Sequence, residues 1–162
     1  MSKHTVTSAT LWQLVLPVLW FGTVAAISFI EAPLKFQAPG ITIPLGLGIG
    51  RLVFMALNIV EGVILVCLLV AGFASRPARV TGARLWVLIG LAAVFISKVT
   101  LVRPPLNART DLVLEGADPG QSPWHYVYIV CDVVTLALLV WFTALTMRIL
   151  RRALLHTGTS AG

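Results

Sequence analysis

Charged residues are scarce in this chain. Lys, Arg, Asp and Glu make up 11% of its 162 residues, whereas an ordinary soluble domain carries about 25%. Hydrophobic residues reach 58%, and the mean hydropathy is +0.95. A surface facing water cannot be built from so few charges, so the composition excludes a soluble globular protein. The length allows one domain, and we expect residues 1–162 to form a single integral membrane domain.

Acidic residues and cysteines are also few. Six Asp plus Glu stand against twelve Lys plus Arg, which gives a net charge of +6. This basic excess is not gathered on a soluble face, so we expect no nucleic-acid partner. Two cysteines cannot support a disulfide-rich scaffold.

Long apolar runs are what the sequence has instead. They cover residues 11–30, 52–74, 85–102 and 126–149, and a helix needs about 20 apolar residues to cross the hydrocarbon core. The runs are continuously apolar, which disfavours a membrane β-barrel with its alternating pattern. Lys3 and a Val24-Ala25-Ala26 stretch make the first run resemble a signal peptide, but the run continues to Ile30. We therefore predict an all-α bundle of four transmembrane helices.

The positions of Lys and Arg predict the orientation. Two tails and the segment after the second run carry basic residues without acids: Lys3, Arg76, Arg79, Arg84, Arg148, Arg151 and Arg152. The other connecting segments mix bases with acids: Lys35, Arg51, Arg103 and Arg109 with Glu31, Asp111, Glu115 and Asp118. This bias places both termini in the cytoplasm. We expect a multi-pass protein of the bacterial cytoplasmic (inner) membrane, with the lipid bilayer as its partner.

Two outer segments connect the predicted helices. Residues 32–50 are rich in Pro and Gly yet partly apolar. This predicts an interfacial or re-entrant segment, or an apolar external loop lying on the headgroups. Residues 103–124 are polar enough to be an ordinary solvated loop.

Ionisable side chains inside the predicted spans are the main functional signal. The second span holds Asn58 and Glu61, the third holds Lys98, and the fourth holds Asp132. Each charge costs roughly 2.5–3.5 kcal/mol to insert. At ~1.5 Å per residue, Glu61, Asp132 and Lys98 lie about 15, 10 and 6 Å from the outer helix ends. They therefore fall at a common level in the outer half of the membrane.

Helical spacing groups these residues into two stripes. Arg51, Asn58 and Glu61 share an arc of about 80° on the second helix. A similar arc on the fourth helix holds His125, Tyr128, Asp132 and Thr135. We predict a polar pocket between the second, third and fourth spans, open toward the outside. The alternative is that these groups only join the helices by hydrogen bonds and a buried ion pair.

The predicted function is to bind, or help move, a small ligand in this pocket. Glu61 and Asp132 would be its acidic partners and Lys98 their counter-charge. The side chains that would orient the ligand or gate the outer rim are Asn58, His125, Tyr128 and Arg51. No Glu-x-x-His pair for a di-iron site occurs, so we expect no metal, and the sequence indicates no particular cofactor. The alternatives are a membrane oxidoreductase using His125 and the neighbouring acids, and an accessory subunit of a membrane complex or a homo-oligomer.

Several short motifs resemble known families. They are EAPLKF (31–36), GRLVF (50–54), VRPPLNAR (102–109) and WH (124–125). Their layout is similar to that of the transmembrane-protein-205-like family of small bacterial four-helix membrane proteins, and the resemblance implies this architecture without an activity. PLN (105–107) before the last helix also resembles anthrone-oxygenase-like membrane proteins. That second resemblance implies oxygenation of an aromatic substrate without a metal.

Overall fold

The computed structural model describes residues 7–74, 76–117, 120 and 122–158. Its elements are α1 (Ser8–Val24), η1 (Ala25–Glu31), α2 (Ala32–Leu34), η2 (Lys35–Gln37), α3 (Ile43–Phe73), η3 (Arg76–Ala78), α4 (Ala83–Ser97), η4 (Lys98–Val102), α5 (Arg103–Leu114) and α6 (Pro123–Gly158). In this part of the chain, four continuous helices are long and apolar enough to cross a membrane. The predicted all-α fold of four membrane-spanning helices is confirmed.

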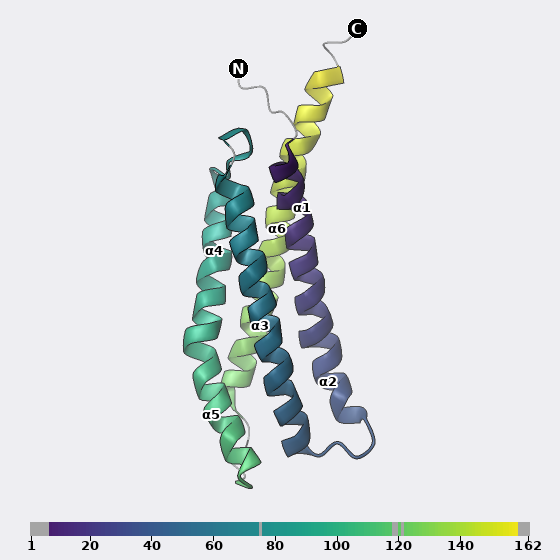
Figure 1. Cartoon of the computed structure of the whole chain (residues 1–162), viewed down its shortest axis with the longest axis vertical. Helices are drawn as coiled ribbons and strands as arrows, with labels where there is room; N and C mark the ends of the chain where they lie inside the picture. The colour runs from purple at the N-terminus through teal and green to yellow at the C-terminus, as the bar shows by residue number, and fades with distance from the viewer. Residues whose placement is uncertain (1–6, 75, 118–119, 121, 159–162) are drawn as a thin grey trace.

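The four long helices run up and down beside one another (Figure 1). The start of α1, η3 and the end of α6 lie at one end, which we call the upper end. The lower end holds η2, the start of α3, α5 and the start of α6. α1 packs against α3 and α6, and α4 packs against α6. Lys3 and Asp118, which entered the charge argument, lie outside the described residues.

The side chains at the centre of the bundle are large and apolar. The fully buried ones include Trp20, Leu57, Leu68, Leu88, Leu91, Leu139 and Phe142. Many residues of the outer surface are apolar as well, and Trp86 is 73% exposed. A surface of this kind suits hydrocarbon rather than water, because it offers few groups that water can hydrate. The protein is therefore a multi-pass membrane protein by its helices and its surface.

Residues 32–50 differ from the prediction. Here the first helix continues through η2, and α3 already begins at Ile43, so residues 38–42 are the only connection. The Thr42 hydroxyl accepts a hydrogen bond from the Leu45 amide at 3.4 Å and caps α3. Pro44 falls in the first turn, where its missing amide leaves no helical bond unmade. Pro44 is thus part of a helix start, and the prediction of an interfacial, re-entrant or loop segment over residues 32–50 is wrong for α3 from Ile43 onward.

The expected loop at 103–124 is also helical over α5. Two wide π-helical turns precede Pro33 of the first helix and Pro104 of the third, whereas Pro17 lies within the regular helix α1. η1 ends two positions before Pro33, and η4 ends two positions before Pro104. A proline ring clashes with the carbonyl of the preceding turn in a regular α-helix, and a wider turn relieves that clash. Lys98 consequently lies near the middle of a continuous helix, not about 6 Å from its end as predicted.

Candidate functional site

Lys98 is the centre of a buried ionic cluster that joins three helices. Its Nζ lies 2.7 Å and 2.8 Å from the two Glu61 carboxylate oxygens of α3. It also lies 2.7 Å from Asp132 Oδ1 of α6. All three residues are 0% exposed. We call Glu61, Lys98 and Asp132 the triad. Each of the three ammonium protons has one carboxylate oxygen as its acceptor.

The first helix reaches the triad through Trp20. The indole Nε1–H donates to Glu61 Oε1 at 2.9 Å, and the side chain is completely buried. The Trp20 ring also meets Phe95 edge to face, with centroids 6.4 Å apart. Sequence reasoning missed Trp20 because an aromatic residue in an apolar run carries no polar signal. The only available sign was that a buried indole needs an acceptor.

Tyr128 and Asn58 form the next layer toward the lower end. The Tyr128 hydroxyl donates to Asn58 Oδ1 at 3.0 Å. The Tyr128 ring lies beside the ammonium, with Lys98 Nζ 5.2 Å from its centroid, and meets Phe54 edge to face at 5.3 Å. The Tyr128 ring therefore covers one side of the triad and also lines a neighbouring cavity.

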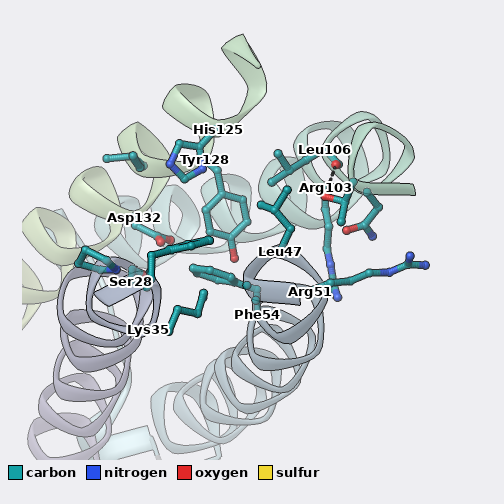
Figure 2. A pocket seen from close by; sticks show the side chains of 18 of the residues that line it. Ser28, Lys35, Leu47, Arg51, Phe54, Arg103, Leu106, His125, Tyr128 and Asp132 are labelled. Atoms are coloured by element: carbon teal, nitrogen blue, oxygen red, sulfur yellow. Dashed lines mark hydrogen bonds between the residues drawn. The ribbon is translucent and has the colours of Figure 1, made fainter. Parts of the chain in front are cut away.

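A cavity of about 420 Å³ opens beside the triad at the lower end (Figure 2). Its apolar walls include Phe29, Phe36, Leu47, Phe54, Leu106 and Ile129. Its polar lining includes Ser28, Lys35, Arg51, Arg103, Asn107, Thr110, His125, Tyr128 and Asp132. These residues come from η1, η2, α3, α5 and α6, so the ends of all four long helices contribute. The size and the mostly apolar walls are those of a small-molecule site.

Asp132 connects the triad to this cavity. Its Oδ1 accepts from Lys98, whereas its Oδ2 is buried and has no hydrogen-bond partner among the described residues. Ser28 Oγ, which also lines the cavity, is buried and without a partner. Such groups are expensive when left unsatisfied. Both orphaned oxygens belong to residues that line the cavity.

The cations around the cavity differ in their partners. Lys35 forms an ion pair with Glu31 at 3.2 Å, and Arg51 forms one with Asp111. The Arg103 guanidinium has no ion pair or side-chain hydrogen bond within the described residues. With its carboxyls ionised, the triad holds two negative charges and one positive charge. Among the described residues, one carboxylate of the triad and the Arg103 guanidinium therefore have no charge of opposite sign paired with them.

The predicted site residues fall into two groups in the structure. Glu61, Lys98 and Asp132 meet directly, with Asn58 and Tyr128 adjacent. His125 and Arg51 line the cavity nearer its mouth and are exposed. The His125 ring meets the Tyr126 ring edge to face, with centroids 6.0 Å apart, and no contact ties it to the triad. Sequence reasoning placed Lys35 and Arg103 in the outer connecting segments and did not assign them to the site.

A second polar cluster lies at the upper end. Gln13 is 0% exposed and donates through Nε2 to the Ala71 and Ala78 carbonyls, both at 2.8 Å. The Arg84 guanidinium donates to Gln13 Oε1 at 2.9 Å and to the Arg79 carbonyl at 3.2 Å. This network ties α1 to the connection between α3 and α4. Its partners are mostly backbone carbonyls, which is typical of a structural role.

Metal binding can be judged from the ligand types present. In residues 7–74, 76–117, 120 and 122–158, no three His, Cys, Asp or Glu side chains are grouped closely enough to hold a metal ion. Cys67 and Cys131 are free thiols. The ionic chemistry of the site is therefore that of the triad and the cavity cations.

Comparisons of this chain with protein-family models, curated proteins and solved structures found no match. The site consequently has to be interpreted from its own geometry.

Proposed function

We propose that this protein binds, and helps move, a small amphipathic ligand in the cavity at the lower end. The observation that carries the proposal is Asp132. One of its oxygens is fixed by Lys98, and the other is buried and unpartnered among the described residues, in a side chain that lines the cavity. A group that served only to join helices would have its hydrogen bonds made by those helices.

The two π-helical turns support the same proposal. η1 contributes Ser28 and Phe29 to the cavity, and η4 begins at Lys98. π-helical turns occur frequently at functional sites. Here both of them lie where the triad adjoins the cavity, although the two helices that contain them are otherwise regular over most of their length.

The proposal includes an orientation in the bacterial cytoplasmic membrane. Arg76, Arg79 and the basic end of α6 lie at the upper end, without acids beside them in sequence. The positive-inside rule then supports cytoplasmic termini and a cavity that faces outward. The motif layout supports kinship with the transmembrane-protein-205-like family as part of this proposal.

Cysteine accessibility tests the proposal. The background is the chain with Cys67→Ala and Cys131→Ala, carrying either Leu106→Cys in the cavity wall or Ile59→Cys on the surface of α3, where Ile59 is 61% exposed. A charged, membrane-impermeant thiol reagent should modify only the first variant, and only from the outside of intact cells. A small amphipathic molecule such as 3-[4-(aminomethyl)phenyl]propionate should slow that modification.

The result distinguishes the cavity site from simple helix packing. Equal reaction of both variants, or no reaction at Leu106→Cys, would show that the cavity is not an accessible site. Reaction from the inside alone would reverse the proposed orientation. The remaining functions predicted from the sequence stay predictions: the oxidoreductase or oxygenase, and the accessory subunit or homo-oligomer. An absorption spectrum and co-purification in mild detergent test them.

A further inference from the structure

We infer that the ligand carries an amino group at one end, an acidic group at the other and an apolar body between them. This inference rests on the proposed function and specifies its ligand. It comes from the two uncompensated charges at the cavity and from where they lie.

The negative pole is Asp132 with Ser28. Ionised, Asp132 Oδ2 can only accept a hydrogen bond, and no described residue donates to it; Ser28 Oγ and Asn58 Nδ2 are themselves unpartnered and make no bond to it. Lys98 gives its three protons to Glu61 and to Asp132 Oδ1, and the Tyr128 hydroxyl donates to Asn58. No described residue thus supplies a donor to Oδ2, and we expect a molecule in the cavity, whose lining includes Asp132, to supply it. A cationic donor would also balance the second carboxylate of the triad, which a neutral hydroxyl would not.

The positive pole is Arg103. Lys35 and Arg51 each have a carboxylate of their own, whereas the Arg103 guanidinium has none among the described residues. Guanidinium groups bind carboxylates in a two-point geometry that a single ammonium cannot offer. An acidic group of the ligand is the partner that this position lacks.

The two poles lie on opposite sides of the cavity. Figure 2 shows Asp132 and Ser28 on one side, Arg103 and Arg51 on the other, and Phe54 and Tyr128 between them. An α-amino acid carries its two charged groups on one carbon, with no apolar body between them to lie against these rings. The groups must instead be separated by a spacer, and the aromatic rings between the poles favour an apolar one.

A matched series of probes built on one ring tests the inference, first on the chain with an unchanged triad. The full probe is 3-[4-(aminomethyl)phenyl]propionate. Its partners are 3-(4-methylphenyl)propionate without the amine, 4-propylbenzylamine without the acid, and 3-[4-(hydroxymethyl)phenyl]propionate with a hydroxyl for the amine. The readout is the probe concentration that halves the rate of thiol modification at Leu106→Cys.

The full probe should be effective at a concentration at least about tenfold lower than each partner, because each partner lacks a charge-assisted hydrogen bond. Arg103→Gln should remove most of the difference in effective concentration between the full probe and 4-propylbenzylamine, which lacks the acid. Arg51→Gln should remove less, since that guanidinium is held by Asp111. Asp132→Asn should remove the advantage of the amine over the hydroxyl.

Different failures have different meanings. If no probe slows a cysteine that does react, the proposed function fails. If probes bind but the full probe is no better than the acid, the amine or the hydroxyl analogue, the proposed function stands and the inferred ligand class is wrong. A larger loss for Arg51→Gln than for Arg103→Gln would overturn the assignment of the positive pole.

Discussion

Replacing Lys98 by methionine should damage the fold more than removing either acid of the triad. The ammonium makes contacts of 2.7 to 2.8 Å to three carboxylate oxygens and is 0% exposed. Lys98→Met would leave Glu61 and Asp132 facing each other inside the bundle, with only the Trp20 indole as donor. Breaking a buried pair in this way costs about 3–5 kcal/mol, against a total stability of roughly 5–15 kcal/mol.

Neutralising Asp132 should have the smallest effect. In Asp132→Asn the triad keeps one ammonium and one carboxylate, the two Lys98 contacts to Glu61 survive, and the unpartnered anionic oxygen is gone. We expect the unfolding free energy of Asp132→Asn to change by no more than about 1 kcal/mol. Glu61→Gln should lower the unfolding free energy by about 1.5–3 kcal/mol, which is between the effects of Lys98→Met and Asp132→Asn. The reason is that a neutral amide then replaces the carboxylate that accepted two hydrogen bonds from the Lys98 ammonium.

Reversible unfolding in mixed micelles with a rising fraction of dodecyl sulfate, followed by tryptophan fluorescence, would measure these differences. The triple variant Lys98→Met, Glu61→Gln, Asp132→Asn is the control, because it removes every charge together. It should recover most of the stability that Lys98→Met loses. If Asp132→Asn proves as damaging as Lys98→Met, Asp132 is needed to compensate the ammonium, and the reasoning from an excess carboxylate is refuted.

Three further variants test other parts of the structure. Trp20→Phe removes the indole donor to the triad and should lower the unfolding free energy by about 1.5–3 kcal/mol. An unchanged unfolding free energy in the same assay would show that the Trp20–Glu61 hydrogen bond does not stabilise the fold. Gln13→Leu leaves a buried guanidinium and two carbonyls short of partners and should cost about 1–3 kcal/mol or more, lowering the melting temperature. Gly46→Leu would bring its Cβ against the Phe36 ring and place its side chain at the cavity. Gly46→Leu should therefore make the full probe less able to slow thiol modification at Leu106→Cys. The control Gly22→Leu, whose Cβ meets nothing within 4 Å, should leave this effect of the probe unchanged. If the probe slows modification equally in both variants, the wall at Gly46 is not part of the site.

The sequence predicted the helices and the meeting of the triad for the same physical reason. Hydrocarbon tolerates long apolar runs, and it makes an isolated charge so costly that Glu61, Lys98 and Asp132 have to find one another. That argument needs only residue types and an approximate depth. It does not need helix boundaries, which explains why the group was found even though the depth predicted for Lys98 was wrong.

Prolines and glycines misled the prediction of the lower end. In soluble proteins, Pro33, Pro104 and Pro105 would stop a helix. In this bundle the wide turns η1 and η4 accommodate them, so the helices extend well past the predicted ends. Arg103 consequently lies on a helix facing the cavity instead of in a solvated loop. Local sequence carried no sign of this, because the wide turns depend on packing between helices.

The order in which the chain is made gives the triad a further consequence. Glu61 precedes Lys98 by 37 positions, and Lys98 precedes Asp132 by 34. At about 5–20 residues per second, the carboxyl of α3 waits on the order of seconds for its cation. Until then it must pass the translocon as a lone polar group. The first hairpin of the nascent protein is therefore held together by Trp20, by Gln13 and by apolar contacts, and the charge of Glu61 is balanced only when the third helix arrives.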